Sequence, residues 1–284
     1  MRPQPGQVAV VTGGGSGIGL ALSNALAECG LDLVLADLDP AALGEAEARV
    51  ATHGTRVTSK VVDVTDQNAV DRLAEYTLEQ FGRVDIVVNN AGVIGKCLPI
   101  WEYECVEWEW IFGVNVLGVI HGIRSFVPHL VKQHSGHIVN TSSMAGLSVV
   151  PQLGPYTAAK HAVVSLSETL RADLDVRAPE VGVTVLCPGP TDTPLVLDGG
   201  RARPEHLLPS VDAGTKPGLD PLTMTVAGEM QPPAVVADAT IDAMIRGCLY
   251  VAPHPIAGER LRQRIDRIST DVLGVTEVKE VDAE

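Results

Sequence analysis

The first two-thirds of the chain alternate between short apolar runs and longer amphipathic stretches. The short runs are rich in Val, Ile and Leu and almost uninterrupted, which is typical of strands covered on both faces. They predict strands over 8–12, 31–36, 55–61, 84–89, 137–141 and 181–187. The stretches between them predict helices over 20–29, 40–53, 67–81, 114–133 and 156–177.

Alternating strands and helices predict the α/β class, with right-handed crossovers and a doubly wound parallel sheet. We expect helices on both faces of this sheet. No internal repeat or low-complexity tract divides the 284 residues, so a single domain over 1–284 is predicted.

Two segments lack this rhythm. Residues 193–233 contain many Pro and Gly residues without a clear period, and a loop of this length indicates a functional lid or a disordered segment. We interpret it as a substrate loop. Residues 276–284 are mostly polar and acidic and predict a frayed tail.

All three tryptophans lie in the segment WEYECVEWEW at 101–110, which alternates as a strand does. Two interpretations carry equal weight. In one, a surface helix packs its aromatic residues on the core. In the other, the segment forms a subunit interface or a pocket wall, because aromatic residues are enriched at interfaces.

The formal net charge of −14 argues against nucleic acid and anionic lipid as partners. No run approaches the roughly 18 consecutive apolar residues of a membrane span, and the N-terminus lacks the apolar core of a signal peptide. We expect a cytoplasmic protein whose partners are a small-molecule substrate and copies of itself.

The five cysteines are scattered at positions 29, 97, 105, 187 and 248, with no CxxC pair. This usage favours reduced thiols over a disulfide framework or a structural zinc site. No HExxH motif is present, so no metal is expected.

A glycine-rich turn, TGGGSGIG at 12–19, follows the first predicted strand and opens the next helix. Glycine lets the backbone approach a pyrophosphate, and a helix N-terminus offers free N–H groups. No Lys-Ser/Thr pair follows the glycines, which argues against a P-loop. A dinucleotide site is therefore expected at the residues Gly13, Ser16, Gly17, Ile18 and Gly19.

The GxxxGxG spacing of this turn resembles that of the short-chain dehydrogenase/reductase family in its compact form. Further motifs carry the resemblance over about 7–194: Asp63-Val64, Asn89-Asn90-Ala91-Gly92, Asn115, Ser142-Ser143, Tyr156-Thr-Ala-Ala-Lys160 and Pro188-Gly-Pro-Thr-Asp-Thr193. The segment 247–251 looks like the family's last strand. The resemblance implies a Rossmann fold and an oxidoreductase.

Asp37 ends the second predicted strand, 18 residues after Gly19, where an acid can bind the adenosine ribose 2′-hydroxyl. Its carboxylate would also repel a 2′-phosphate. Ser16 and Leu38 stand where relatives that prefer NADP carry Arg or Lys. We therefore expect NAD as the cofactor, against the alternative that Asp37 is an ordinary loop acid.

By resemblance, Asp63 and Val64 flank the adenine and Asn90 lies beside the cofactor ribose. Thr191 and Thr193 would hold the nicotinamide carboxamide. Asn89, in contrast, is expected to brace the sheet internally.

Tyr156 and Lys160 are four residues apart, so a helix places both on one side. Alcohol oxidation needs a base, and a free tyrosine with a pKa near ~10 is a poor one. A nearby ammonium favours the phenolate. We expect Tyr156 to be the acid/base, with Lys160 lowering its pKa and binding the ribose.

The family's serine lies 13 residues before its tyrosine, which selects Ser143 over Ser142. Its hydroxyl would hold the substrate oxygen. The resemblance makes Asn115 the anchor of a water that relays protons through Lys160. The alternative for Asn115 is a core side chain bonded to the backbone.

These residues predict an NAD-dependent enzyme that interconverts a secondary alcohol and a ketone. Apolar residues at 93, 94, 147, 149–151, 153, 195 and 196 could line a pocket for a steroid, terpenoid or alicyclic compound, or simply pack beneath the loop. Alternatives are a carbonyl reductase of another substrate class and a non-catalytic NAD-sensing regulator. The resemblance also implies a homodimer or homotetramer formed through helices at about 101–134 and 156–177.

Overall fold

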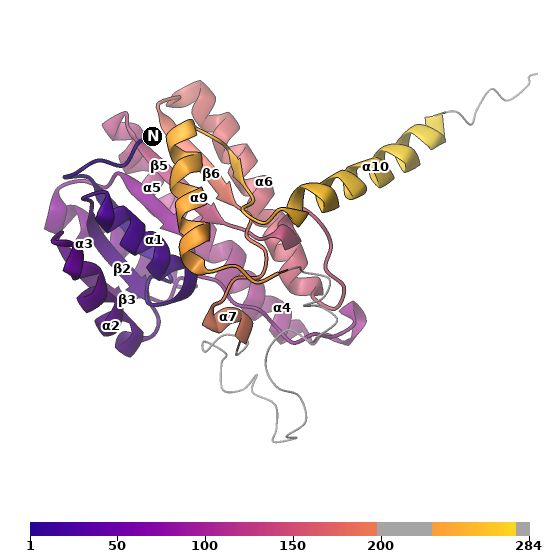
Figure 1. Cartoon of the computed structure of the whole chain (residues 1–284), viewed down its shortest axis with the longest axis horizontal. Helices are drawn as coiled ribbons and strands as arrows, with labels where there is room; N and C mark the ends of the chain where they lie inside the picture. Colours follow the sequence, from indigo (N-terminus) through magenta and orange to yellow (C-terminus); the bar gives the residue numbers. More distant parts are fainter. Residues whose placement is uncertain (198–228, 277–284) are drawn as a thin grey trace, which may run out of the picture.

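The computed structural model describes residues 1–197 and 229–276. Its centre is one parallel sheet (Figure 1). The strands are β1 (Val8–Thr12), β2 (Asp32–Asp37), β3 (Val57–Val61), β4 (Ile86–Asn89), β5 (Gly136–Thr141), β6 (Val181–Leu186) and β7 (Tyr250–Val251). Their order is β3-β2-β1-β4-β5-β6-β7. The predicted α/β fold with a parallel sheet is confirmed.

The strand order places a crevice between β1 and β4. From β1 the chain adds β2 and β3 on one side, and from β4 it adds the later strands on the other. Ligands in such sheets bind at this reversal, beyond the carboxyl ends of the strands. The glycine-rich turn follows β1 and the Asn89-Asn90 pair lies at the end of β4, so both predicted motifs meet there.

Helices cover both faces of the sheet. The helices of the described residues are α1 (Gly17–Glu28), α2 (Pro40–Val50), α3 (Gln67–Phe81), α4 (Cys105–Phe112), α5 (Gly118–Gln133), α6 (Gly154–Arg177), α7 (Pro194–Leu197), α9 (Pro233–Arg246) and α10 (Ile256–Thr276). Helix α10 does not cover the sheet but extends away from it (Figure 1). One core joins the sheet to α1, α2 and α9, and a second joins it to α3, α5 and α6. Within β1, Ala9 and Val11 belong to the first core and Val10 to the second. This alternation explains why the strands are apolar without interruption.

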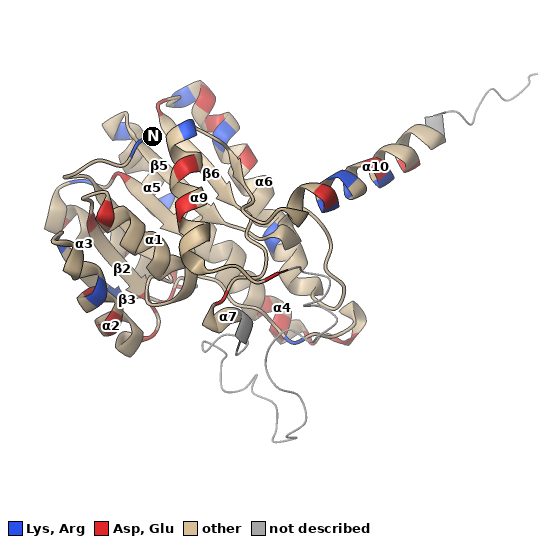
Figure 2. Cartoon of the chain, in the orientation of Figure 1, with Lys and Arg blue, Asp and Glu red and all other residues tan. Residues whose placement is uncertain are grey.

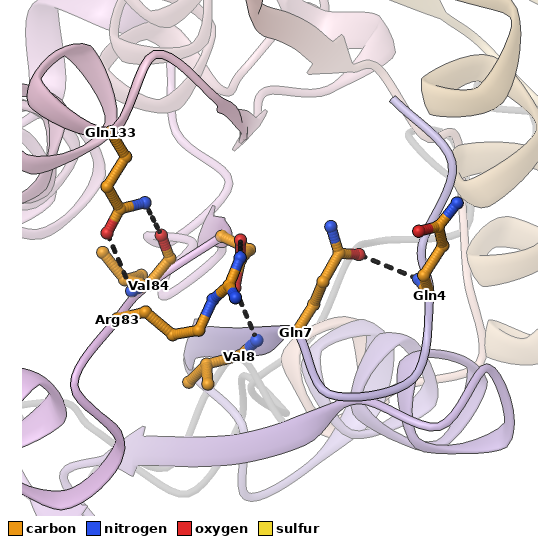
Figure 3. Close-up of polar contacts among 7 residues, drawn as sticks. Gln4, Gln7, Val8, Arg83, Val84 and Gln133 are labelled. Carbon is orange, nitrogen blue, oxygen red and sulfur yellow. Dashed lines mark hydrogen bonds and ion pairs between the residues drawn. The ribbon is translucent and has the colours of Figure 1, made fainter.

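A buried carboxylate holds together the amino ends of β1 and β4, at the end of the sheet opposite the crevice. Asp85 accepts hydrogen bonds from the backbone N–H of Val8 at 2.9 Å and from two nitrogens of Arg83 at 2.8 and 2.7 Å. The hydrogen bonding between Arg83 and Asp85 raises the pKa of the Arg83 guanidinium. Gln133 bonds both backbone groups of Val84 (Figure 3). These contacts hold the start of β1 against the approach to β4.

Several predicted helix boundaries were wrong by a few residues. The predicted helix 20–29 begins earlier, at Gly17, because the glycine turn itself forms its first turn. The predicted helix 156–177 begins at Gly154, with Pro155 in its first turn. The predicted helix 40–53 ends at Val50 and continues as a 3₁₀ turn, Ala51–His53.

The predicted helix 114–133 is the last part of a longer helical run. This run starts with α4, passes through a π-helical turn at Gly113–Leu117 and continues as α5. The strands predicted at 31–36, 55–61, 84–89, 137–141 and 181–187 shift by one or two residues at their ends. Strand ends depend on pairing with neighbours, which apolar patterning alone does not fix.

The Trp-rich segment forms no strand. Residues Ile100–Glu102 make a 3₁₀ turn, and Trp108 and Trp110 lie on α4. Trp110 packs against the small core around Ile111, and Trp108 stacks against Phe112 with ring centroids 6.0 Å apart. Trp101 is 80% exposed and lines a surface hollow. The core interpretation therefore holds for Trp110, and the pocket-wall interpretation fits Trp101.

The run Cys105–Gln133 is long and apolar enough to cross a membrane by length and composition alone. Of its most apolar 18-residue window, 44% is buried inside the molecule. Core helices have the same composition, and α5 packs on the sheet through Phe126 and Leu130.

The predicted substrate loop at 193–233 falls largely outside the described residues. Its beginning is the short helix α7, and its end runs into α9. The acidic tail predicted at 276–284 lies outside the described residues from 277 onwards, after α10 ends at Thr276.

Candidate active site

The glycine-rich turn adopts a conformation that requires glycine at defined positions. Gly13 and Gly17 have φ values of +65° and +53°, which disfavour a side chain. At Gly19 a Cβ atom would lie 2.1 Å from the carbonyl oxygen of Gly13. A side chain at any of these three positions would therefore strain or open the turn, whose backbone faces the crevice.

Thr12 and Asn90 join the turn to the end of β4. The Thr12 hydroxyl accepts hydrogen bonds from the backbone N–H groups of Asn90 and Ala91, at 2.9 and 3.1 Å. The side chain of Asn90 returns a bond to the Thr12 carbonyl at 3.1 Å. This network fixes the position of the turn relative to β4.

Helix α1 begins beside this turn with free backbone donors. Ser16 is the N-cap in an extended conformation, and among the described residues no side chain caps the helix. Uncapped N–H groups at a helix N-terminus form a site for a phosphate group. The turn and the helix end thus fit the pyrophosphate of a dinucleotide.

One cleft gathers most of the residues predicted to form the site. Those that line it are Gly13, Ser16, Gly17, Ile18, Asn90, Ser143, Tyr156, Lys160, Thr191 and Thr193. Gly19, Asp37, Asp63, Val64 and Asn115 are the predicted residues that do not line it. They lie outside it for different reasons.

Asp37 stands at the end of β2, next to the glycine turn. Its Oδ2 accepts a hydrogen bond from the Gly15 N–H at 3.0 Å, and its Oδ1 accepts from Leu38 and Asp39 at 2.8 and 3.2 Å. The carboxylate is therefore held by three backbone donors at the edge of the dinucleotide site. A negative charge fixed in this place fits a ribose diol and opposes a phosphate.

Asp63 and Val64 follow β3, one strand further out. Asp63 is exposed, and its Oδ1 accepts hydrogen bonds from the N–H and hydroxyl of Thr65. Val64 is buried against Gly118 of α5. Both residues lie beyond the carboxyl end of β3, at the same end of the sheet as Asp37.

Tyr156 and Lys160 lie one turn apart on α6 and both face the cleft. The ammonium of Lys160 is 5.6 Å from the centre of the Tyr156 ring and donates a hydrogen bond to the Thr141 carbonyl at 2.9 Å. Lys160 is only 3% exposed. The predicted juxtaposition of phenol and ammonium is thus present.

The pKa values reveal how strongly burial acts here. Burial raises the pKa of Tyr156, and a hydrogen bond with Ser143 lowers it by a smaller amount. Burial also lowers the pKa of Lys160 to about 8. Desolvation is therefore the largest effect on both groups, and the lowering of the Tyr156 pKa by Lys160 stays a prediction.

The two adjacent serines have different environments. The Ser142 hydroxyl is buried and donates to the Lys160 carbonyl at 2.7 Å. The Ser143 side chain accepts a hydrogen bond from the Ala145 N–H at 3.1 Å and interacts with Tyr156. Ser142 therefore fixes α6, whereas Ser143 faces the phenol.

Asn115 lies in the π-helical turn and is fully buried. Its side chain bonds both backbone groups of Val93, at 2.8 and 2.9 Å. These bonds fit the alternative interpretation, a core asparagine bonded to the backbone, and the proton relay stays a prediction. The contact also places the backbone at Gly92 between Asn115 and Lys160. A Cβ at Gly92 would lie 3.1 Å from Asn115 Oδ1 and 3.4 Å from Lys160 Nζ.

The prediction for Asn89 is confirmed. Its Nδ2 donates to Asn140 Oδ1 at 2.9 Å, and Asn140 in turn donates to the Ser167 hydroxyl at 3.0 Å. This chain of amides ties β4, β5 and α6 together inside the core.

His254 is a site residue that sequence reasoning missed. It is 3% exposed, and its ring bonds two neighbouring residues of the loop after β6. Its Nδ1 accepts from the Gly189 N–H at 2.9 Å, and its Nε2 donates to the Pro190 carbonyl at 2.8 Å. Burial lowers its pKa, which favours the neutral ring that both bonds require. The ring fixes the loop from which Thr191 and Thr193 enter the cleft.

The sequence held one signal for His254. It lies just after the segment predicted as the last strand, at the same end of the sheet as the Pro188–Gly189 motif. Only the tertiary pairing of β6 with β7 brings the two segments together.

The apolar residues predicted to line a substrate pocket are divided by the structure. Within the described ranges, Leu195 lines the cleft, whereas Val93, Ile94 and Leu153 are buried in the core. Val149–Pro151 border the separate surface hollow beside Trp101. Val93, Ile94 and Leu153 are thus core residues, and for the other members of this set the substrate-pocket interpretation stays a prediction.

A glycine turn for a dinucleotide and a Tyr–Lys pair in one cleft define a dinucleotide-dependent oxidoreductase. Comparison with known proteins gives the family. Residues 7–202 match the family model described as short chain dehydrogenase. The chain belongs to the short-chain dehydrogenase/reductase family.

Three relatives show how far the similarity extends. The 1-deoxy-11-beta-hydroxypentalenate dehydrogenase of Streptomyces arenae is 42% identical over 194 residues, 67% of this chain and 69% of that protein. A short-chain dehydrogenase/reductase from Burkholderia phymatum, solved in complex with NAD, is 37% identical with a TM-score of 0.86, covering 100% of this chain and 99% of that one. The CLA biosynthesis dehydrogenase/reductase of Lactiplantibacillus plantarum is 28% identical over 95% of this chain and 96% of that protein.

Proposed function

We propose that this protein is an NAD-dependent oxidoreductase that interconverts a hydrophobic secondary alcohol and its ketone. One observation carries the proposal: Ser143, Tyr156 and Lys160 line the same cleft as the glycine turn. The cleft therefore joins a dinucleotide site to an acid/base group.

The residues present fit a dinucleotide. The glycine turn leaves no space for a Cβ at Gly19, and the N-terminus of α1 presents uncapped donors. Bound NAD would supply the hydride acceptor or donor for the reaction. The turn would hold its pyrophosphate, Asn90 and Lys160 its nicotinamide-side ribose, and Thr191 and Thr193 its carboxamide.

The chain's own residues handle the proton and the substrate oxygen. Tyr156 takes the hydroxyl proton during oxidation and returns it during ketone reduction. Ser143 donates a hydrogen bond to the substrate oxygen and orients it toward the phenol. Lys160 supplies positive charge near the phenol, and this charge favours the phenolate despite burial.

Asn115 has a supporting role in this proposal. By holding the backbone of Val93, it fixes Gly92 beside the Lys160 ammonium. A water bound in this region would connect Lys160 to solvent. The π-helical turn that carries Asn115 is a feature often found at functional sites.

Asp37 supports NAD over NADP. Its carboxylate is pinned by three backbone N–H groups, so it cannot swing away from an added phosphate without losing them. The Burkholderia relative was solved with NAD, which agrees with this preference. Asp63 and Val64 would flank the adenine from the next strand.

The substrate proposal rests on the apolar residues that line the cleft. Ile18, Pro188, Pro194 and Leu195 line it together with the polar catalytic groups. An apolar wall of this kind favours a steroid, terpenoid or alicyclic alcohol. The relative from Streptomyces arenae is named as a dehydrogenase of 1-deoxy-11-beta-hydroxypentalenate, a name that supports an alcohol substrate.

A homodimer or homotetramer and a cytoplasmic location complete the proposal. Family membership supports the oligomer, and the acidic, thiol-containing composition supports the location.

A panel of alicyclic, steroid and linear secondary alcohols, each offered with NAD and with NADP, tests the proposal. Absorbance of the reduced nicotinamide reports turnover. We expect turnover with NAD that increases with the apolar bulk of the alcohol. Turnover only with NADP, or only with small polar alcohols, would contradict the cofactor or the substrate part respectively.

A further inference from the structure

Helix α10 extends away from the rest of the molecule instead of packing on the sheet (Figure 1). It has 21 residues, and every residue from 262 to 274 is exposed. At a rise of about 1.5 Å per residue, it is about 31 Å long. A helix of this length offers a surface that the fold described above does not use.

An apolar stripe follows one side of this helix. Leu261, Ile265, Ile268 and Val272 recur at intervals of four, three and four residues, which is the heptad spacing of paired helices. Ile265, Ile268 and Val272 are 49%, 47% and 59% exposed. A partner helix laid along the stripe would remove these side chains from water.

The local sequence also argues for a partner. Residues 269–272 read Ser-Thr-Asp-Val, and each has modest or low helix propensity. A helix of this length in water owes its stability mainly to packing of its apolar face. Pairing along the stripe supplies that packing.

The charges beside the stripe select the orientation of the partner. Arg264 and Asp271 occupy equivalent heptad positions, one residue before Ile265 and Val272. If two copies of α10 run antiparallel with Ile265 opposite Ile268, Arg264 of each copy faces Asp271 of the other. In a parallel pair, Arg264 would face Ser269 and form no ion pair.

We propose that α10 pairs antiparallel with α10 of a second copy of this chain. Leu261, Ile265, Ile268 and Val272 form the seam, and two reciprocal Arg264–Asp271 ion pairs set the register. This surface is separate from the helices at 101–134 and 156–177, through which the family resemblance predicts assembly.

An anionic membrane fits the helix less well than a second copy does. Acidic and basic residues are interspersed along α10 (Figure 2). Membrane-surface helices concentrate Lys and Arg on their polar face. The net charge of −14 also repels anionic lipid.

Charge exchange in the full-length chain tests the proposal by sedimentation across a concentration series. The variants Arg264→Asp and Asp271→Arg should each weaken self-association about tenfold, because both ion pairs become like-charge contacts. The double exchange should restore wild-type association. A mixture of the two single variants should associate, because each then supplies the charge that the other lacks.

A substitution that disrupts the apolar seam provides a second test. Ile268→Asp should halve the mass of the largest assembly while turnover and the circular dichroism spectrum stay at wild-type levels. Unchanged mass in Ile268→Asp, or no restoration in the double exchange, would overturn the proposal. Flotation of the wild-type protein with phosphatidylglycerol vesicles, lost in Ile268→Asp at unchanged mass, would assign the stripe to lipid and also overturn it.

Discussion

The carboxylate of Asp37 accepts a hydrogen bond from the backbone N–H of Gly15, with 3.0 Å between Oδ2 and the nitrogen. This contact links the end of β2 to the middle of the glycine turn. A Cβ at Gly15 would lie 2.9 Å from the same oxygen, so the approach depends on glycine. The group proposed to select the cofactor is thus fixed to the backbone proposed to bind it.

Replacing this carboxylate should alter cofactor choice. We expect Asp37→Ser to lower kcat/KM with NAD by about ten- to a hundredfold, the cost of a lost hydrogen bond to a charged group. The value with NADP should fall less or rise, because a repulsive charge is removed. Glu45→Ser, an exposed change of the same charge on α2, serves as control and should leave both values unchanged. An equal loss with both cofactors would contradict the role given to Asp37.

The affinity for NAD should depend on pH through Lys160. Its pKa is about 8 in the free protein because burial lowers it. A ligand that needs the ammonium binds with constant affinity below this pH, and its affinity falls by up to about tenfold per pH unit above it. Calorimetric titration of NAD across this range measures the effect. The Lys160→Met variant should bind weakly at every pH with no break near 8; a break that persists in the variant would assign it to another group.

A methyl group at Gly19 should destroy the dinucleotide site. In Gly19→Ala the new Cβ would lie 2.1 Å from the Gly13 carbonyl oxygen, a backbone atom that cannot move without opening the turn. We expect loss of NAD binding and a lower melting temperature. Gly44→Ala is the matched control, because Gly44 lies in α2 with no atom within 4 Å of a new Cβ. That variant should gain about 0.5–1 kcal/mol of stability and keep NAD binding.

His137 should make the fold sensitive to acid. Burial lowers its pKa from 6.5 to about 3, with the N-terminal ammonium and Arg171 adding smaller effects. In the unfolded chain, His137 therefore binds a proton below about pH 6.5, whereas in the folded chain it binds one only below about pH 3. Stability is complete above this window and falls by about 1.4 kcal/mol per pH unit within it.

Urea unfolding at several pH values measures this effect. His137→Asn keeps a side chain that can bond Thr184, the partner of His137 Nε2, but does not titrate in this range. The variant should be less stable at neutral pH and should lose less stability on acidification. Parallel pH profiles for both proteins would contradict the assignment to His137.

The strands and the position of the site could be predicted from the sequence because both depend on local patterns. Helix α3 was predicted to the residue, since Asp66 caps its start and Gly82 ends it with a φ of +74°. The residues of the glycine turn and the Tyr156–Lys160 pair were found from spacing that follows directly from strand and helix geometry.

The rest depends on contacts between distant segments. The π-helical turn at Gly113–Leu117 has no signal in the apolar period, because the helical pattern continues through it. His254 acts on a loop 65 residues away in sequence, through a contact that only the paired strands create. The pKa of Tyr156 could not be inferred from the nearby lysine, since burial of the phenol depends on the complete cleft.

The central claim is that Tyr156 exchanges the proton in a cleft that also binds NAD. The most direct test compares wild-type and Tyr156→Phe protein in two measurements, NAD binding by calorimetry and turnover of the best secondary alcohol with NAD. The variant loses only the phenolic hydroxyl, so we expect NAD affinity within about threefold of wild type and turnover reduced by about a hundredfold or more. Turnover at the wild-type level in Tyr156→Phe would contradict the account.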